Sequence, residues 1–225
     1  MERISPTKEY KYYHDPEARE QLFNEVKVVA EYIHDQKIPN IILPDRSARN
    51  FYVPLWEYWK TVYPDDKKPN IYFTSPGPLF SGFFYVEPEG PEGPDVAYDM
   101  DNTYKHLVRD SALPLLVYDT CMHSGDTILK IKKRFTNMGF NDIRIGVSSK
   151  SHGGNIVDID LVASSEALVR GCYPFGKGSL VQRPSDGGVL STRNDYTFRG
   201  IENVQRAKDE RGEMKRIIVD GLARQ

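Results

Sequence analysis

The 225 residues carry 30 Lys and Arg against 32 Asp and Glu, and this net charge of −2 provides no overall basic field for nucleic acid or an anionic membrane. No run of about 18 apolar residues could cross a bilayer, and the first residues lack the apolar core of a signal peptide. Two cysteines make neither a disulfide framework nor a zinc site, so a cytoplasmic protein is expected. The length predicts a single domain over residues 1–225.

The first half of the chain alternates between helical and strand periodicity. A helix is expected from Pro16, because Asp15 can cap its free amides and apolar residues recur at helical spacing from Leu22 to Ile33. The elements predicted after it are a buried strand at 38–44, a helix containing Val53, Trp56 and Trp59, a strand at 70–74 and a Pro- and Gly-rich loop at 75–103.

The second half begins with the most distinctive segment of the sequence. An apolar run from Leu115 ends in the carboxylate of Asp119, as in a buried parallel strand, and a short loop of small, hydroxyl-bearing residues follows. A helical stripe then starts at Ile128 and is closed by Gly139. The elements predicted beyond it are strands at 142–147 and 156–162, and a hood with a charged helix at about 170–225, the helix at 197–223.

Alternating strands and helices favour an α/β fold, namely a mostly parallel, twisted sheet with helices on both faces and a C-terminal hood region. The core of this fold would span about residues 36–165.

The loop between Asp119 and the following helix has the features of a phosphate cradle. A helix start offers free backbone N–H groups and the positive end of the helix dipole, both of which attract anions. Asp119, just before the loop, could meet a sugar hydroxyl or a hydrated cation beside that phosphate. The alternative is an ordinary strand–turn–helix unit without a ligand.

Residues 115–127 resemble the ribose-phosphate signature of type I phosphoribosyltransferases, which has an apolar strand, two acidic residues, two variable residues and a Thr-Thr-Gly-Gly-Thr-like loop. The resemblance implies that Asp119 and Thr120 hold ribose hydroxyls, with Asp119 also supporting Mg²⁺ indirectly. The residues that it assigns to the 5′-phosphate loop are His123, Ser124, Gly125, Asp126 and Thr127. Two departures stand out, because Thr120 replaces a carboxylate and Asp126 places a negative charge where glycine is common. A protonated His123 would offset the charge of Asp126.

A second anion-binding turn is expected after the first strand, where Arg46 and Arg49 flank Ser47 and Ala48. In the resembled family, the loop at this point binds the pyrophosphate of phosphoribosyl pyrophosphate, largely through backbone amides. Two guanidinium groups beside small residues suit a diphosphate, although both could also simply face solvent. Because parallel strands end at one edge of a sheet, both turns are expected there together.

The resemblance implies a phosphoribosyltransferase-like enzyme of nucleotide metabolism. It would transfer the phosphoribosyl group from phosphoribosyl pyrophosphate, with Mg²⁺, to a nitrogenous, nucleobase-like acceptor and release pyrophosphate. Its partners would be small molecules, not nucleic acid or membrane, with a homodimer as an option. The alternative is a non-catalytic regulator of the same fold that senses phosphoribosyl pyrophosphate or a nucleotide, because a missing carboxylate and an acidic loop suit binding without turnover.

A less favoured alternative comes from Asp99, Asp101 and Thr103, which resemble the Asp-x-Asp-x-Thr nucleophile loop of haloacid dehalogenase-like phosphatases. That chemistry requires a buried strand directly before the motif. Only three residues, 96–98, precede it here after a Gly-Pro-Asp sequence, so a strand in the sheet core is not expected.

Overall fold

Strands and helices alternate along most of the computed structural model. It describes residues 9–44, 48, 51–74, 83–86, 96–97, 107–122, 125–150, 158–164, 180–182, 189–191 and 201–225. The elements of the parallel core are α1 (Pro16–Asp35), β1 (Asn40–Pro44), α2 (Tyr52–Val62), β2 (Asn70–Thr74), β5 (Leu115–Met122), α4 (Asp126–Asn137), β6 (Ile143–Lys150) and β7 (Leu161–Val162). The other elements are β3 (Phe83–Val86), β4 (Val96–Ala97), β8 (Leu180–Gln182), β9 (Val189–Ser191) and α5 (Ile201–Leu222).

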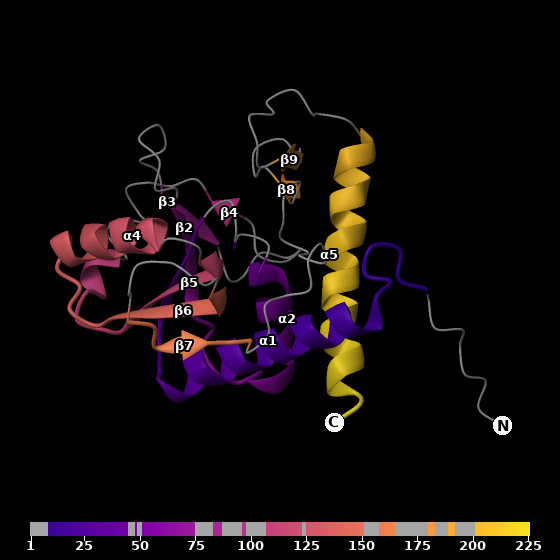
Figure 1. Ribbon diagram of the computed structural model, residues 1–225, viewed down its shortest axis with the longest axis horizontal. Coiled ribbons are helices and arrows are strands. Elements are labelled where there is room, and N and C mark those ends of the chain that lie inside the picture. Colours follow the sequence, from indigo (N-terminus) through magenta and orange to yellow (C-terminus); the bar gives the residue numbers. More distant parts are fainter. Residues whose placement is uncertain are drawn as a thin grey trace.

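The central sheet has the strand order β4-β3-β2-β1-β5-β6-β7. The run from β2 to β7 is parallel throughout, whereas β3 and β4 extend it as antiparallel strands at one edge. Helices α1 and α2 lie on one side of this sheet and α4 on the other (Figure 1). The predicted fold class, a mostly parallel sheet with helices on both faces, is therefore confirmed.

Helix α1 begins as its capping signals predict. The side chain of Asp15 accepts a hydrogen bond from the backbone N–H of Glu17 at 2.9 Å, and Pro16 occupies the first helical position. The apolar stripe from Leu22 to Ile33 is buried against the sheet. Helix capping and apolar periodicity therefore agree in this element.

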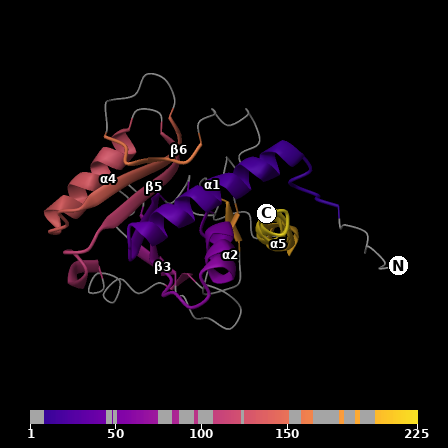
Figure 2. The same ribbon diagram turned by 90° about the horizontal axis from the view of Figure 1, so that it is seen from below.

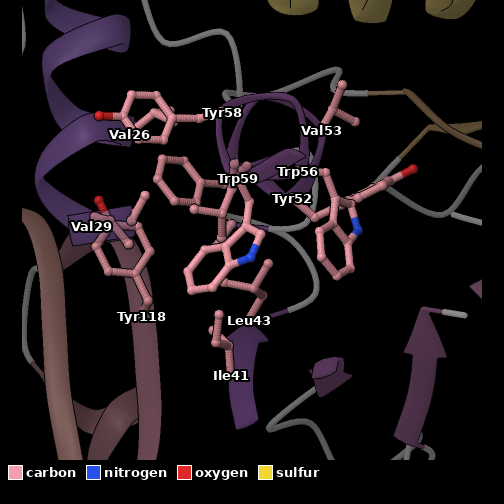
Figure 3. Packing of buried hydrophobic residues seen from close by; sticks show 14 of the residues in the cluster. Val26, Val29, Ile41, Leu43, Tyr52, Val53, Trp56, Tyr58, Trp59 and Tyr118 are labelled. Atoms are coloured by element: carbon pink, nitrogen blue, oxygen red, sulfur yellow. The ribbon is translucent and has the colours of Figure 1, made fainter. Parts of the chain in front are cut away.

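The core on the α1 face is rich in aromatic side chains. Figure 3 shows Trp56 and Trp59 of α2 packed above Leu43 of β1, with Tyr118 of β5 beside them. Both tryptophans are more than nine-tenths buried, and burying one large apolar side chain is worth about 1.5–3 kcal/mol. This packing fixes α2 against the sheet.

The opposite core lies under α4. Ile128, Ile131 and Phe135 form the predicted apolar stripe and pack with the β5 and β6 side chains that point to this face. Gly139 has φ +96°, a left-handed conformation that ends the helix at little steric cost because glycine has no Cβ. The strand–loop–helix unit predicted from the sequence is thus present.

The predicted loop at 75–103 is partly wrong, because two short strands lie within it. Strand β3 pairs antiparallel with β2, and β4 pairs with β3. The four residues of β3 are aromatic or β-branched, which suits a pleated surface, but the flanking Pro and Gly residues concealed this tendency.

Several predicted strand ends also differ from the structure: β1 begins at Asn40 instead of 38, and β6 runs to Lys150 instead of 147. Strand β5 continues past Asp119 to Met122, because it pairs with β6 as far as Lys150. The predicted strand at 156–162 is reduced to β7, since residues 158–160 are described and are not strand.

The charged helix predicted near the C-terminus is confirmed as α5. Met214, Ile217 and Ile218 are buried, and the helix packs beside α1 and α2, as the view in Figure 2 shows along its axis. Most of the predicted hood lies outside the described residues, but β8 and β9 form an antiparallel pair that contacts α5. None of the helices in the described ranges has the length and apolar character that crossing a bilayer requires.

Candidate functional site

Strands β1 and β5 form a topological switch point in the sheet. They are parallel neighbours, yet the chain leaves β1 for β2 on one side and later returns to place β5 on the other. In open α/β sheets, ligands bind in the crevice outside the carboxyl ends of the strands at such a reversal. Strands β1 and β5 both end at this edge.

The two strands stop pairing before they end. Their register runs from Asn40 with Leu115 to Ile42 with Val117. Strand β1 then continues for two residues to Pro44, and Asp119 lies the same two residues beyond the last pair on β5. Asp119 therefore lies on β5 beyond its register with β1.

Asp119 and Thr120 point to opposite faces of the sheet, because successive side chains of a strand alternate. Asp119 follows Val117 onto the α4 face and is 5% exposed. Thr120 follows Tyr118 onto the α1 face and is 2% exposed. The structure thus places both residues near the switch point but does not bring their side chains together.

The start of α4 has no side-chain cap from its N-cap residue. Gly125 is the N-cap residue with φ 79° and ψ −6°, a left-handed conformation, and it supplies no side-chain hydrogen bond to the helix. The first N–H groups of a helix have no intrahelical acceptor, and an anion is one group that can serve as their acceptor. Asp126 is exposed at the first helical position and Thr127 is half-buried. His123 and Ser124 lie outside the described residues.

The turn after β1 is anchored in the core. The N–H of Ala48 donates to the carbonyl of Pro44 at 3.1 Å, and the N–H of Phe51 donates to the carbonyl of Ala48 at 2.9 Å. Ala48 is fully buried and its N–H and carbonyl are both bonded within the turn, so this residue anchors the turn in the core. Arg46, Ser47 and Arg49 lie outside the described residues.

This turn and strand β5 share one anchor. The ring of Phe51 lies 4.7 Å from that of Tyr118, which directly precedes Asp119. The residue that follows the turn after β1 and the residue that precedes Asp119 are therefore in contact in the core.

A buried polar pair behind the switch point was missed by the sequence prediction. The hydroxyl of Tyr118 donates to Oε1 of Glu25 at 2.5 Å, and both residues lie in the interior. Burial raises the pKa of Glu25 to about 7, while the Tyr118 and Ser148 hydroxyls work against this rise. A carboxyl group that titrates near neutrality thus supports the strand that carries Asp119.

A sequence signal for Glu25 does exist. It lies three residues after Leu22 and four before Val29, so it occupies the apolar stripe of α1. A carboxylate at such a position must be buried, and a buried carboxyl group requires a hydrogen-bond donor.

The phosphatase motif follows a strand at the rim of the sheet. Asp99, Asp101 and Thr103 lie outside the described residues, but β4, directly before them, is the outermost strand and pairs with β3 alone within the described sheet. The buried strand that the phosphatase chemistry requires is therefore not the element that precedes this motif.

Comparisons with known proteins give a likeness of fold. No family model and no curated protein matches the sequence. Among solved structures, a purine phosphoribosyltransferase from Pyrococcus horikoshii is 15% identical, with a TM-score of 0.39 over 63% of this chain and 80% of that one. A hypoxanthine phosphoribosyltransferase from Staphylococcus aureus is 12% identical, with a TM-score of 0.42 over 64% and 73%. The corresponding enzyme of Trypanosoma cruzi is 10% identical, with a TM-score of 0.41 over 65% and 75%. Values this low carry no residue role across to this chain.

Proposed function

We propose that the protein binds phosphoribosyl pyrophosphate at the switch point between β1 and β5 and transfers its phosphoribosyl group to a nitrogenous, base-like acceptor. The observation that supports this proposal is the signature at 115–127, which supplies a strand carboxylate and a helix start at the edge of the sheet where β1 and its anchored turn also end. A sugar that carries a phosphate and a diphosphate needs anion-binding groups at two points. Between them it needs a group that accepts hydrogen bonds from the sugar hydroxyls.

Each part of the substrate has a candidate partner. The backbone from 124 to 127 would bind the 5′-phosphate, since Gly125 has no Cβ to block a close approach. Asp119 would accept hydrogen bonds from the ribose hydroxyls. Arg46 and Arg49 would hold the pyrophosphate from the turn that Ala48 and Phe51 fix in the core.

Mg²⁺ fits this site as a cation that arrives with the substrate. Among the described residues, no three His, Cys, Asp or Glu side chains gather as metal ligands. Mg²⁺ is commonly held by one or two carboxylates together with substrate phosphates, and Asp119 could be such a carboxylate. The bound cation would neutralise charge on the leaving pyrophosphate.

Catalysis at such a site would depend on position and charge rather than on a nucleophilic side chain. As the bond to pyrophosphate breaks, positive charge develops on the ribose ring and negative charge on the leaving group. The arginines would stabilise the leaving group, and the phosphate loop would hold the ring in line with the acceptor nitrogen.

The direct test is pyrophosphate release from phosphoribosyl pyrophosphate with Mg²⁺ across a panel of purine and pyrimidine bases. We expect release with one class of base, and a loss of about a hundredfold or more in Asp119→Asn, because one preorganised charged group is removed. Asp110→Asn is the matched control, since it makes the same change at a residue away from the switch point. Equal release by the wild type and Asp119→Asn would contradict the proposal.

The regulator is the second candidate, and two observations favour it. Thr120 stands where the signature has its second carboxylate, and it points away from Asp119. Asp126 lies exposed at the helix start, where it opposes a dianionic phosphate. Tight binding of phosphoribosyl pyrophosphate, measured by calorimetry, without release on any base would identify a regulator.

A phosphatase would behave differently in the same assays. It would hydrolyse a generic phosphate ester such as p-nitrophenyl phosphate, and Asp99→Asn would abolish this activity. We expect no such hydrolysis, because the motif follows an edge strand.

A further inference from the structure

Segments from both ends of the described chain line a cavity. It lies between the N-terminal strap, residues 9–14, the beginning of α1 and the last turns of α5, and its volume is about 620 Å³. Pockets for small molecules typically measure about 300–1,000 Å³. The lining residues of this strap pocket are Glu9, Tyr10, His14, Arg19, Arg216, Ile217, Asp220 and Arg224.

The strap is fixed to α5 by one carboxylate. Glu213 accepts hydrogen bonds from the backbone N–H groups of Lys11, Tyr12 and Tyr13 at 2.7, 2.8 and 3.1 Å. Residues 216 and 220 follow Glu213 at three and seven positions, which is one face of the helix, and Arg224 lies in the turn just after the helix. The same face that holds the strap therefore also lines the pocket.

Two guanidinium groups lie against one aromatic ring in this pocket. Arg216 is 3.7 Å and Arg19 is 4.5 Å from the ring centre of Tyr10, and the hydroxyl of Tyr10 donates to Asp220 at 2.6 Å. Arg19 also donates through Nη1 to the carbonyls of Tyr13 and His14. These contacts hold the two charges in place instead of leaving them on mobile side chains.

The arginines retain donor capacity. Within the described residues, none of the three pocket arginines forms an ion pair with Glu9 or Asp220. Nε of Arg216 is buried without a hydrogen-bond acceptor, which is costly unless a ligand supplies one. Three guanidinium groups against two carboxylates leave the lining with a surplus of positive charge.

We propose that the strap pocket is a second ligand site, separate from the switch point, for a small molecule that carries a phosphate group. Phosphate offers several acceptor oxygens in different directions, which suits donors from two helices better than the two coplanar oxygens of a carboxylate do. The ring of Tyr10 and the side chain of Ile217 would contact an apolar part of the ligand.

The test is a titration with inorganic phosphate and with pyrophosphate, followed by NMR at the arginine Nε–H groups and His14. We expect the Arg216 Nε–H signal to shift with saturation, because the buried donor gains an acceptor. In Arg224→Gln we expect the affinity to fall about tenfold, as for the loss of one charge-assisted hydrogen bond. Arg224 is exposed and makes no other hydrogen bond through its side chain within the described residues, so this variant should fold.

Three controls make the result specific. Lys215→Gln removes the same charge from the exposed part of α5 outside the pocket and should keep wild-type affinity. Gly125→Val alters only the switch-point site, so binding in the strap pocket should persist even if the proposed function fails. Titration with succinate tests whether the pocket binds a carboxylate ligand as well as it binds phosphate. Four outcomes would each overturn the proposal. Two concern the variants: equal phosphate affinity of Arg224→Gln and wild type, or loss of binding in Gly125→Val. The other two concern the ligands: succinate binding as tightly as phosphate, or no saturation at millimolar phosphate.

Discussion

Tyr118 connects three parts of the molecule behind the candidate site. Its hydroxyl bonds to Glu25 of α1, its ring contacts Phe51 after β1, and its Cδ2 would lie only 2.9 Å from a Cβ at Gly146 of β6. Gly146 is therefore required to make room for the tyrosine ring. Because Tyr118 directly precedes Asp119, this packing sets the position of the part of β5 that carries the candidate carboxylate.

The first residue-scale prediction concerns Glu25 and pH. Burial raises its pKa from 4.5 to about 7, so the unfolded chain releases this proton at a lower pH than the folded protein. The tighter hold of the folded protein on this proton favours the folded state. The favourable effect is complete below pH 4.5 and is lost as the pH rises to 7. Glutamine has no carboxyl group to ionise, so the Glu25→Gln variant does not pay the cost of a buried charge above pH 4.5. The free energy of unfolding of this variant, relative to that of wild type, should therefore increase by about 3 kcal/mol between pH 4.5 and 8.

Urea unfolding at several pH values measures this difference. Glu20→Gln, an exposed substitution on the same helix, is the control and should give a nearly constant offset. A difference between wild type and Glu25→Gln that stays constant with pH would show that Glu25 does not titrate in this range.

Gly125 gives the second prediction at this scale. At φ 79° a β-branched residue is strained, so Gly125→Val should lose about 1–2 kcal/mol of stability and also lose binding of ribose 5-phosphate. Gly125→Asn tolerates the left-handed conformation and should fold as stably as wild type within about 1 kcal/mol, yet bind more weakly because a side chain enters the cradle. Calorimetry with ribose 5-phosphate measures the affinity, and wild-type affinity in the valine variant would refute the cradle.

At the scale of the element, two glycines of α5 should respond in opposite directions. A Cβ at Gly221 would meet Cγ and Cε2 of Phe23 on α1 at 2.6 Å, whereas a Cβ at Gly212 has no atom within 4 Å. Gly221→Ala should therefore destabilise the protein by about 1–3 kcal/mol through overpacking of α1 against α5. Gly212→Ala should stabilise it by about 0.5–1 kcal/mol through helix propensity. Chemical unfolding tests the pair, and changes of equal sign would mean that the α1–α5 contact is not tight.

The same scale shows which elements a sequence can predict. Helices α1 and α4 were predicted well because their caps and apolar stripes are local signals. The length of β5 depends on its pairing with β6, and β3 depends on the edge of β2, so both require contacts distant in sequence. Asp119 was found from a local motif for the same reason. The opposite orientation of Thr120 follows only once β5 is known to continue past Asp119.

At the scale of the whole molecule, Glu213 ties the strap to the last helix across about 200 residues of sequence. Glu213→Ala leaves three backbone donors without their acceptor, so it should cost about 1–3 kcal/mol and open the amides of 11–13 to hydrogen exchange. Glu213→Gln keeps an acceptor oxygen and should lie between wild type and alanine. Hydrogen exchange measured by mass spectrometry ranks the protection of these amides in wild type and the two variants. Unchanged protection in Glu213→Ala would show that Glu213 does not hold the strap.

The strand order has a consequence for synthesis on the ribosome. Strand β1 is translated early, but its neighbour β5 follows about 70 residues later, which at about 5–20 residues per second is a delay of about 4–14 s. During this time one side of the Ile41–Leu43 segment has no partner, and an apolar, unpaired strand can associate with other chains. The nascent chain should therefore depend most on a chaperone just before Leu115 emerges.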